Sequence, residues 1–176
     1  KTVYYYLHDL ARLGVVVTTR KRKHSLYSFN YVYWGALKDF VSALQDYDKS
    51  SLVPRDALLI KIYKDSVLFK SLRVQDATPT SFSAYIDYGI ELGLRDNYYT
   101  LPKRELSIED VFIHSLDSAE GRSQRLFCIL FYLRNRDKLQ SVLHPMVKDI
   151  MAVLQGEKVK GYPSIEDVED RAEMYG

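Results

Sequence analysis

The fold of the N-terminal part is decided by the stretch KTVYYYLHDLARLGVVVTTRKRKHSLYSFN, residues 1–30. Apolar side chains recur at helical spacing before the first glycine, which predicts a helix with one narrow apolar stripe. The residues of this stripe are Val3, Leu7, Leu10 and Leu13. Gly14 follows at a position where a left-handed helix cap favours glycine. The β-branched run 15–19 and the alternating run 26–29 predict a two-stranded hairpin with the basic segment 20–24 at its tip.

The same stretch resembles a known family. The run from Thr2 to Val15 is similar to the pattern T-V-x-x-x-L-x-x-L-x-x-x-G-hydrophobic of many bacterial and archaeal winged-helix regulators. The resemblance implies that the first helix is a recognition helix for the major groove and that the hairpin is the wing. The residues that it places against DNA are Lys1, Thr2, Tyr4, Tyr5, His8, Arg12, Arg20, Lys21, Arg22 and Lys23. Those that it implies to pack inward are Val3, Leu7 and Leu10.

The resemblance also predicts that the sequence is part of a longer protein. The two helices that precede the recognition helix in this family are absent, and the sequence begins with lysine rather than methionine. Without those helices, the apolar stripe of the first helix lacks its usual cover.

Charge is distributed unevenly along the chain. Residues 1–30 carry six Lys or Arg and one acid, a net charge of +5. The remaining residues carry 19 basic and 22 acidic side chains, a net charge of −3, so the whole-chain value of +2 hides the asymmetry. A localised phosphate-binding surface produces such a pattern. The alternative is a solvated hairpin tip that is charged for solubility.

Composition predicts a globular protein of the cytoplasm. No apolar run approaches the ~20 residues that a membrane-spanning helix needs. Cys128 is the only cysteine, so the sequence can form neither an intrachain disulfide nor a zinc site built from several cysteines. Because Cys128 lies in the apolar run 126–131, we expect a buried core residue rather than a nucleophile.

The pattern after the hairpin predicts three parts. Residues 1–33 form the recognition helix and wing, and residues 34–53 form a linker helix with apolar spacing at Leu37, Phe40, Val41 and Leu44. The polar segment that ends at Pro54 marks the boundary to a C-terminal domain, residues 54–176.

The C-terminal domain is predicted to contain a few strands followed by a helical end. Strands are expected over 57–63, 67–74 and 98–102, the first two as a hairpin. The segment 82–94 has helical spacing but two glycines, which leaves its structure ambiguous. The helices expected after residue 107 cover 108–118, 122–139, a segment opened by Pro145 and an acidic segment after Ser164. The predicted fold class is therefore α+β, with a partial winged helix at the N-terminus.

This layout is weakly similar to that of AbiEi-type antitoxin and regulator proteins. The similarity rests on the order of strands and helices and on the polar-acidic helix start at Ser107, Glu109 and Asp110. It implies an autorepressor of a toxin–antitoxin operon, in which the C-terminal part contacts a partner toxin and the winged helix binds the promoter. For a regulator of this class we also expect a homodimer.

Enzymatic motifs are weak in this sequence. His114 has Asp110 four residues before it and Asp117 three residues after it, a trio that could hold a metal or orient a base. A surface histidine with a hydrogen bond is the favoured interpretation. The basic run 134–138 could touch phosphate or RNA, but a solvated helix end with favourable charges in its last turn is the favoured interpretation. There is no phosphate loop, nucleophile elbow or dinucleotide fingerprint. We therefore expect no catalytic residues, no metal and no cofactor.

Two hypotheses remain from the sequence. In the first, the protein is a DNA-binding transcription regulator. In the second, residues 55–176 form the working part, as a protein-interaction or small catalytic module, and the winged helix only docks it.

Overall fold

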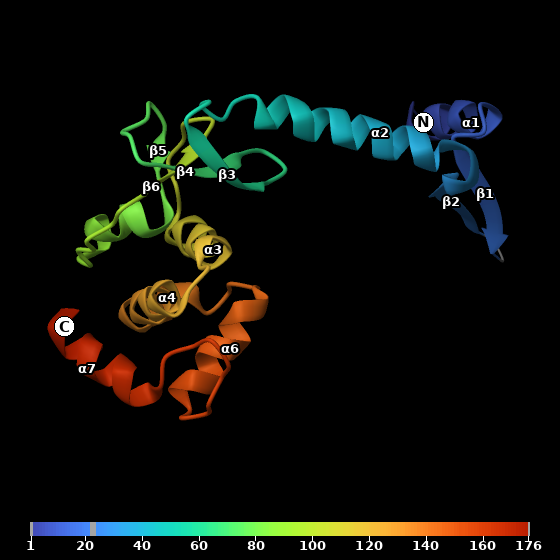
Figure 1. Ribbon diagram of the computed structural model, residues 1–176. Helices are drawn as coiled ribbons and strands as arrows, with labels where there is room; N and C mark the ends of the chain where they lie inside the picture. Colours follow the sequence, from blue (N-terminus) through green and yellow to red (C-terminus); the bar gives the residue numbers. More distant parts are fainter. Residues whose placement is uncertain (1, 22–23, 176) are drawn as a thin grey trace. The chain divides into compact units, whose positions relative to one another are not determined.

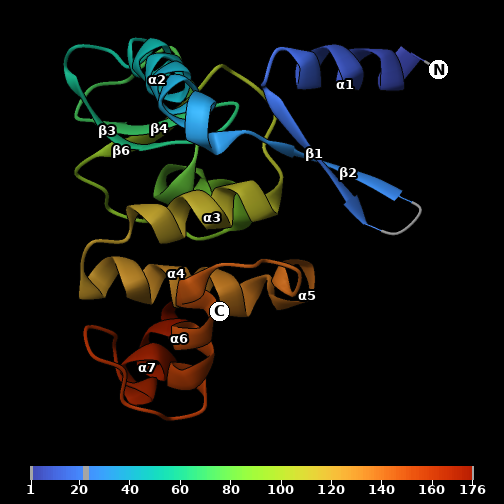
Figure 2. The ribbon, with the colours of Figure 1, turned by 90° about the vertical axis from the view of Figure 1, so that its right-hand side faces the viewer.

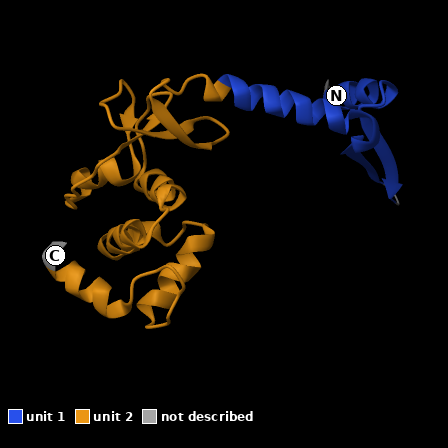
Figure 3. Ribbon diagram, in the orientation of Figure 1, with its two compact units in different colours: residues 1–48 blue, residues 49–176 orange. Residues whose placement is uncertain are grey.

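The chain has an α+β fold that divides into two compact units. The computed structural model describes residues 2–21 and 24–175. One unit comprises residues 1–48 and the other residues 49–176 (Figure 3). Among the described residues, the strands form two antiparallel sheets, one in each unit.

The first unit contains the predicted helix and hairpin, followed by a long helix (Figure 1). Its elements are α1 (Thr2–Arg12), β1 (Val16–Lys21), β2 (His24–Phe29) and α2 (Tyr31–Ser50), whose last two residues lie beyond the boundary at residue 48. Gly14 has a φ of 73°, and the Val15 N–H donates to the Leu10 carbonyl across it. This left-handed cap ends the helix as predicted. The hairpin pairs Lys21 with His24 at its tip.

The start of α2 is tied to the junction between α1 and the hairpin. The Gly14 carbonyl accepts hydrogen bonds from Asn30 Nδ2 at 2.9 Å and from Trp34 Nε1 at 3.1 Å. The Asn30 N–H also donates to the Val15 carbonyl. These bonds satisfy backbone groups at the end of α1, where no intrahelical donor is present. They join α1, the hairpin and the first turn of α2 into one framework.

The sheet of the second unit has the strand order β3-β4-β6-β5. The strands are β3 (Ala57–Ile62), β4 (Val67–Ser71), β5 (Thr78–Pro79) and β6 (Asn97–Leu101). The predicted hairpin of β3 and β4 is confirmed. However, β4 ends at Ser71 rather than at residue 74, because the Ser71 hydroxyl accepts the Arg73 N–H and starts a turn.

The ambiguous segment forms a short 3₁₀ helix, η1 (Ser81–Tyr88), rather than a helix that continues to residue 94. Gly89 ends it with a φ of 76°, and its N–H donates to the Ile86 carbonyl. The side chain of Arg134 covers this glycine so closely that a Cβ there would lie 2.7 Å from a guanidinium nitrogen. The positive φ favours glycine here, because residues with a Cβ rarely adopt it, whereas the end of the Arg134 side chain is flexible and could shift away from a Cβ.

Five α-helices complete the second unit: α3 (Ile108–Ser118), α4 (Arg122–Arg134), α5 (Arg136–Leu139), α6 (Pro145–Leu154) and α7 (Ile165–Tyr175). The capping box at Ser107 and the proline at the start of α6 are confirmed. The prediction of one helix over 122–139 is wrong. The chain breaks at Asn135, where φ is −121° and ψ is 23°, and the Asn135 amide caps the Phe131 carbonyl.

The core of the second unit is built from aromatic side chains between η1, α3 and α4. Figures 1 and 2 show the sheet, α3, α4 and the pair α6 and α7 in successive layers. Phe131 is fully buried and stacks on Tyr85, with ring centroids 4.2 Å apart, and on Phe112 at 5.9 Å. Cys128 is also buried, as predicted, and burial raises the pKa of its thiol to about 12. The thiol is therefore protonated at neutral pH and unsuited to nucleophilic attack.

Candidate nucleic-acid interface

The predicted DNA-contacting residues that can be placed lie on α1 and on the hairpin of the first unit. Lys1, Arg22 and Lys23 lie outside the described residues. Thr2 begins α1. The other six are exposed to solvent: Tyr4, Tyr5, His8, Arg12, Arg20 and Lys21.

On α1, aromatic and polar side chains are displayed together. Tyr4 is 72% exposed and Tyr5 is 67% exposed, and the Tyr5 ring meets the edge of Tyr6 at a centroid distance of 5.9 Å. Arg12 lies 3.7 Å from Asp9 in an exposed ion pair one turn apart. Surface pairs of this kind contribute little to stability, so the guanidinium of Arg12 is readily available to another anion.

The apolar stripe of α1 is only partly covered within the described part of the chain. Val3 and Leu13 are largely exposed, Leu10 is partly exposed and Leu7 is half-buried. Among these residues, the inward packing implied for Val3 is therefore absent, whereas Leu7 and Leu10 are partly covered.

The hairpin carries its cations at the end farthest from α2. Arg20 pairs with Ser25 and Lys21 with His24, and both cations are exposed. The framework around Gly14 fixes β1 relative to α1, and the two elements are in contact. An 11-residue helix is about 16 Å long, a size that enters the major groove of B-DNA.

A second group of polar side chains lies in the other unit. It consists of Lys61, Tyr63, Asp117 and His144, and we name it the Asp117 cluster. Lys61 Nζ lies 2.7 Å from Asp117 Oδ1, and the Tyr63 hydroxyl donates to Oδ2 at 2.5 Å. His144 Nε2 lies 3.5 Å from Oδ1, while its Nδ1 accepts the Met146 N–H at the start of α6.

The contacts of the Asp117 cluster point to a structural role. Burial acts to raise the pKa of Asp117, but the hydrogen bonds from Lys61 and Tyr63 outweigh it, so the pKa is lowered. Burial and the carboxylate together raise the pKa of Tyr63, which keeps its hydroxyl protonated. A carboxylate held by these donors joins β3, α3 and the start of α6. Sequence reasoning missed Lys61, Tyr63 and His144, since they lie 27 to 56 residues from Asp117.

His114 is buried, so the prediction of a surface histidine is wrong. Its Nδ1 lies 2.7 Å from the Thr80 hydroxyl, and its ring packs on Tyr63 at a centroid distance of 4.9 Å. Burial lowers its pKa to about 4. The two carboxylates of the predicted trio have other partners. Asp110 closes the capping box and lies 3.5 Å from Arg104, and Asp117 is bound by Lys61 and Tyr63. Across residues 2–21 and 24–175, no group of three His, Cys, Asp or Glu side chains could hold a metal ion.

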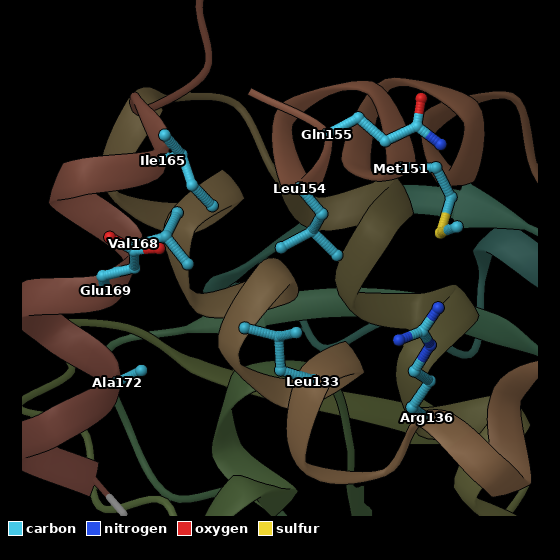
Figure 4. A pocket seen from close by; sticks show the side chains of 9 residues that line it. All are labelled: Leu133, Arg136, Met151, Leu154, Gln155, Ile165, Val168, Glu169 and Ala172. Carbon is cyan, nitrogen blue, oxygen red and sulfur yellow. The ribbon is translucent and has the colours of Figure 1, made fainter. Parts of the chain in front are cut away.

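A pocket of about 340 Å³ opens between α4, α6 and α7 (Figure 4). Its walls are apolar side chains from the three helices: Leu133, Met151, Leu154, Ile165, Val168 and Ala172. Arg136, Gln155 and Glu169 complete the lining. The volume lies at the lower end of the range of small-molecule sites, about 300–1,000 Å³.

Comparison with known proteins gives no relative. No protein-family model matches the chain. No curated protein matches it. No solved structure matches it. Within the described residues, the helices are too short or too polar to cross a lipid bilayer.

Proposed function

We propose that the protein is a DNA-binding transcription regulator. The observation that carries this proposal is the pairing, in one unit, of an exposed helix with a basic hairpin. Tyr4, Tyr5 and His8 lie exposed on α1, and Arg20 and Lys21 lie exposed near the hairpin tip. The net charge of +5 over residues 1–30 supports a phosphate-binding surface.

The two elements have different roles in this proposal. The α1 helix enters the major groove, where Tyr5 and His8 meet base edges. The hairpin cations bind phosphates and set the position of the helix without reading sequence. The second unit has a core of its own and, as in the antitoxin layout that the sequence resembles, serves to bind a partner toxin.

A second candidate function rests on the pocket between α4, α6 and α7. Its apolar walls and its volume of about 340 Å³ suit a binding module in which the second unit does the main work. Under this alternative, the first unit docks the protein and has no preferred DNA sequence.

Binding to DNA at two salt concentrations tests the proposal. The protein is titrated with the duplex from upstream of its own coding sequence and with a random duplex. The first proposal expects preference for the upstream duplex. The variant Arg20→Ala/Lys21→Ala/Arg22→Ala/Lys23→Ala is expected to bind more weakly. Its slope of log K against log salt should be shallower by about 3 to 4, since each lost phosphate contact removes ~0.9.

A matched variant controls for the loss of four charges. Lys64, Arg95, Lys158 and Lys160 are exposed cations of the second unit, and their joint replacement by alanine should leave the slope unchanged. Equal and weak binding to both duplexes, indifferent to the hairpin substitutions, would refute the DNA-reading function and favour the binding module.

The helix and the hairpin are separable by substitution. Tyr5→Ala and His8→Ala are expected to lower the ratio of specific to random binding by about 10- to 100-fold together, because each removes a contact to base edges. The salt slope should stay near the wild-type value, since the phosphate contacts remain. A uniform loss of affinity for both duplexes would instead assign these two residues to the backbone of DNA.

A further inference from the structure

The helix α2 stands out because none of its residues is buried. It runs for 20 residues, from Tyr31 to Ser50 (Figure 1). It nevertheless carries large apolar side chains that are exposed to solvent. Tyr33 is 81% exposed and Phe40 is 60% exposed, while about half of Leu37 and of Leu44 is accessible. Most helices in proteins gain their stability by packing such a face against a neighbour.

The spacing of these side chains is that of a coiled coil. Tyr33, Leu37, Phe40 and Leu44 follow one another at intervals of four, three and four residues, and Tyr47 continues the series three residues later. This is the alternation of a and d positions in a heptad, which gives a narrow seam rather than the broad stripe of a helix on a globular core.

The other faces of α2 agree with a seam. The positions farthest from it are polar from residue 38 onward: Lys38, Asp39, Ser42, Gln45, Asp46 and Lys49. The positions that flank its centre are uncharged and small or branched: Ala36, Val41 and Ala43. Like charges at flanking positions repel identical helices, and no charge stands there between residues 36 and 43.

We propose that α2 pairs with α2 of a second copy of this chain, along the seam formed by Tyr33, Leu37, Phe40 and Leu44. Leucine and aromatic side chains then meet side chains of the same kind, so the surface is complementary to itself. The exposed parts of the seam and of Val41 amount to about 600 Å² per copy, given that an aromatic side chain buries about 150–250 Å². Complete burial of these side chains in the pair would remove about 1,200 Å² from solvent, which is the lower limit of the range for specific interfaces.

This pairing deepens the proposed function and rests on it in one respect only. Since α1, the hairpin and α2 as far as Asp48 belong to one unit, a pair of α2 helices brings two copies of the DNA-contacting elements together. The DNA recognised would then contain two half-sites. The pairing itself needs no DNA and is tested without it.

Sedimentation equilibrium and light scattering on the 176-residue chain, from about 1 to about 200 µM, measure the association. An interface of this size is expected to give a dimer with a dissociation constant in the micromolar range. Leu37→Glu/Leu44→Glu is expected to weaken the dimer by at least about 100-fold, because it places like charges in the seam. The variant should still fold, as neither leucine is buried, and circular dichroism checks this.

Ser42→Glu/Gln45→Glu is the matched control. It adds the same two charges to the polar side of the same helix and should leave the dimer intact. The proposal fails if the wild-type chain is a monomer over the whole range. It also fails if both double variants dissociate equally. A dimer that binds no DNA would keep this inference and overturn the DNA-binding function.

Discussion

Replacing Phe131 with alanine is expected to destabilise the second unit by about 3–5 kcal/mol. The ring is fully buried and touches three other aromatic rings, those of Tyr85, Tyr88 and Phe112. Because these rings come from η1 and α3, they cannot all move to fill the space that the phenyl group leaves. The loss is the transfer free energy of the side chain together with the cost of a cavity.

Urea unfolding followed by near-ultraviolet circular dichroism of the tyrosines measures this loss. Leu143→Ala is the control, since Leu143 is 97% exposed and its truncation should change the free energy of unfolding by less than about 0.5 kcal/mol. Phe131→Leu should fall between the two, because it keeps part of the buried volume. Equal midpoints for Phe131→Ala and Leu143→Ala would show that the aromatic cluster is not the core of this unit.

Acid is expected to weaken the same unit through His114. Burial lowers the pKa of His114 to about 4 in the folded chain, whereas an unfolded histidine has a pKa of about 6.5. Between these two values, the unfolded chain binds a proton that the folded chain does not. Stability therefore falls as the pH drops from about 6.5 to 4, by about 3 kcal/mol from this residue.

Comparison with His114→Gln isolates that contribution. The free energy of unfolding is measured between pH 7 and pH 4 for both proteins, and the variant is expected to lose about 3 kcal/mol less than the wild type over this range. Asp117 affects the stability of the folded chain only at lower pH. Its pKa is lowered in the folded chain, so the stability that it contributes is lost only below its unfolded value of about 3.9. Parallel pH curves for the two proteins would contradict a neutral, buried His114.

The elements that sequence predicted well are those determined by neighbouring residues. The helix, the glycine cap and the hairpin of the first unit follow from signals within thirty residues, as does the capping box at Ser107. The break at Asn135 had no such signal. The break lies between two segments of helical spacing, and neither proline nor glycine stands there. At the break, the side-chain amide of Asn135 donates a hydrogen bond to the Phe131 carbonyl.

The candidate sites divide in the same way. The basic hairpin and the tyrosines of α1 are contiguous in sequence, so they could be named from it, although their contact with DNA remains a prediction. The Asp117 cluster could not be named, because Lys61 of β3 and Tyr63, just after that strand, lie more than fifty residues away in the sequence. The burial of His114 likewise depends on Thr80, which is 34 residues distant. Spacing along one helix carries no information about such contacts.

The hydrogen bond from Trp34 to the Gly14 carbonyl gives the protein an internal optical probe. Trp34 is the only tryptophan of the sequence, and its indole N–H lies at the joint of α1, the hairpin and α2. Indole emission depends on the polarity and hydrogen bonding around the ring. A shift of α1 against the hairpin when a ligand binds would therefore change the colour of the emitted light, and the motion could be timed in unlabelled, unmodified protein.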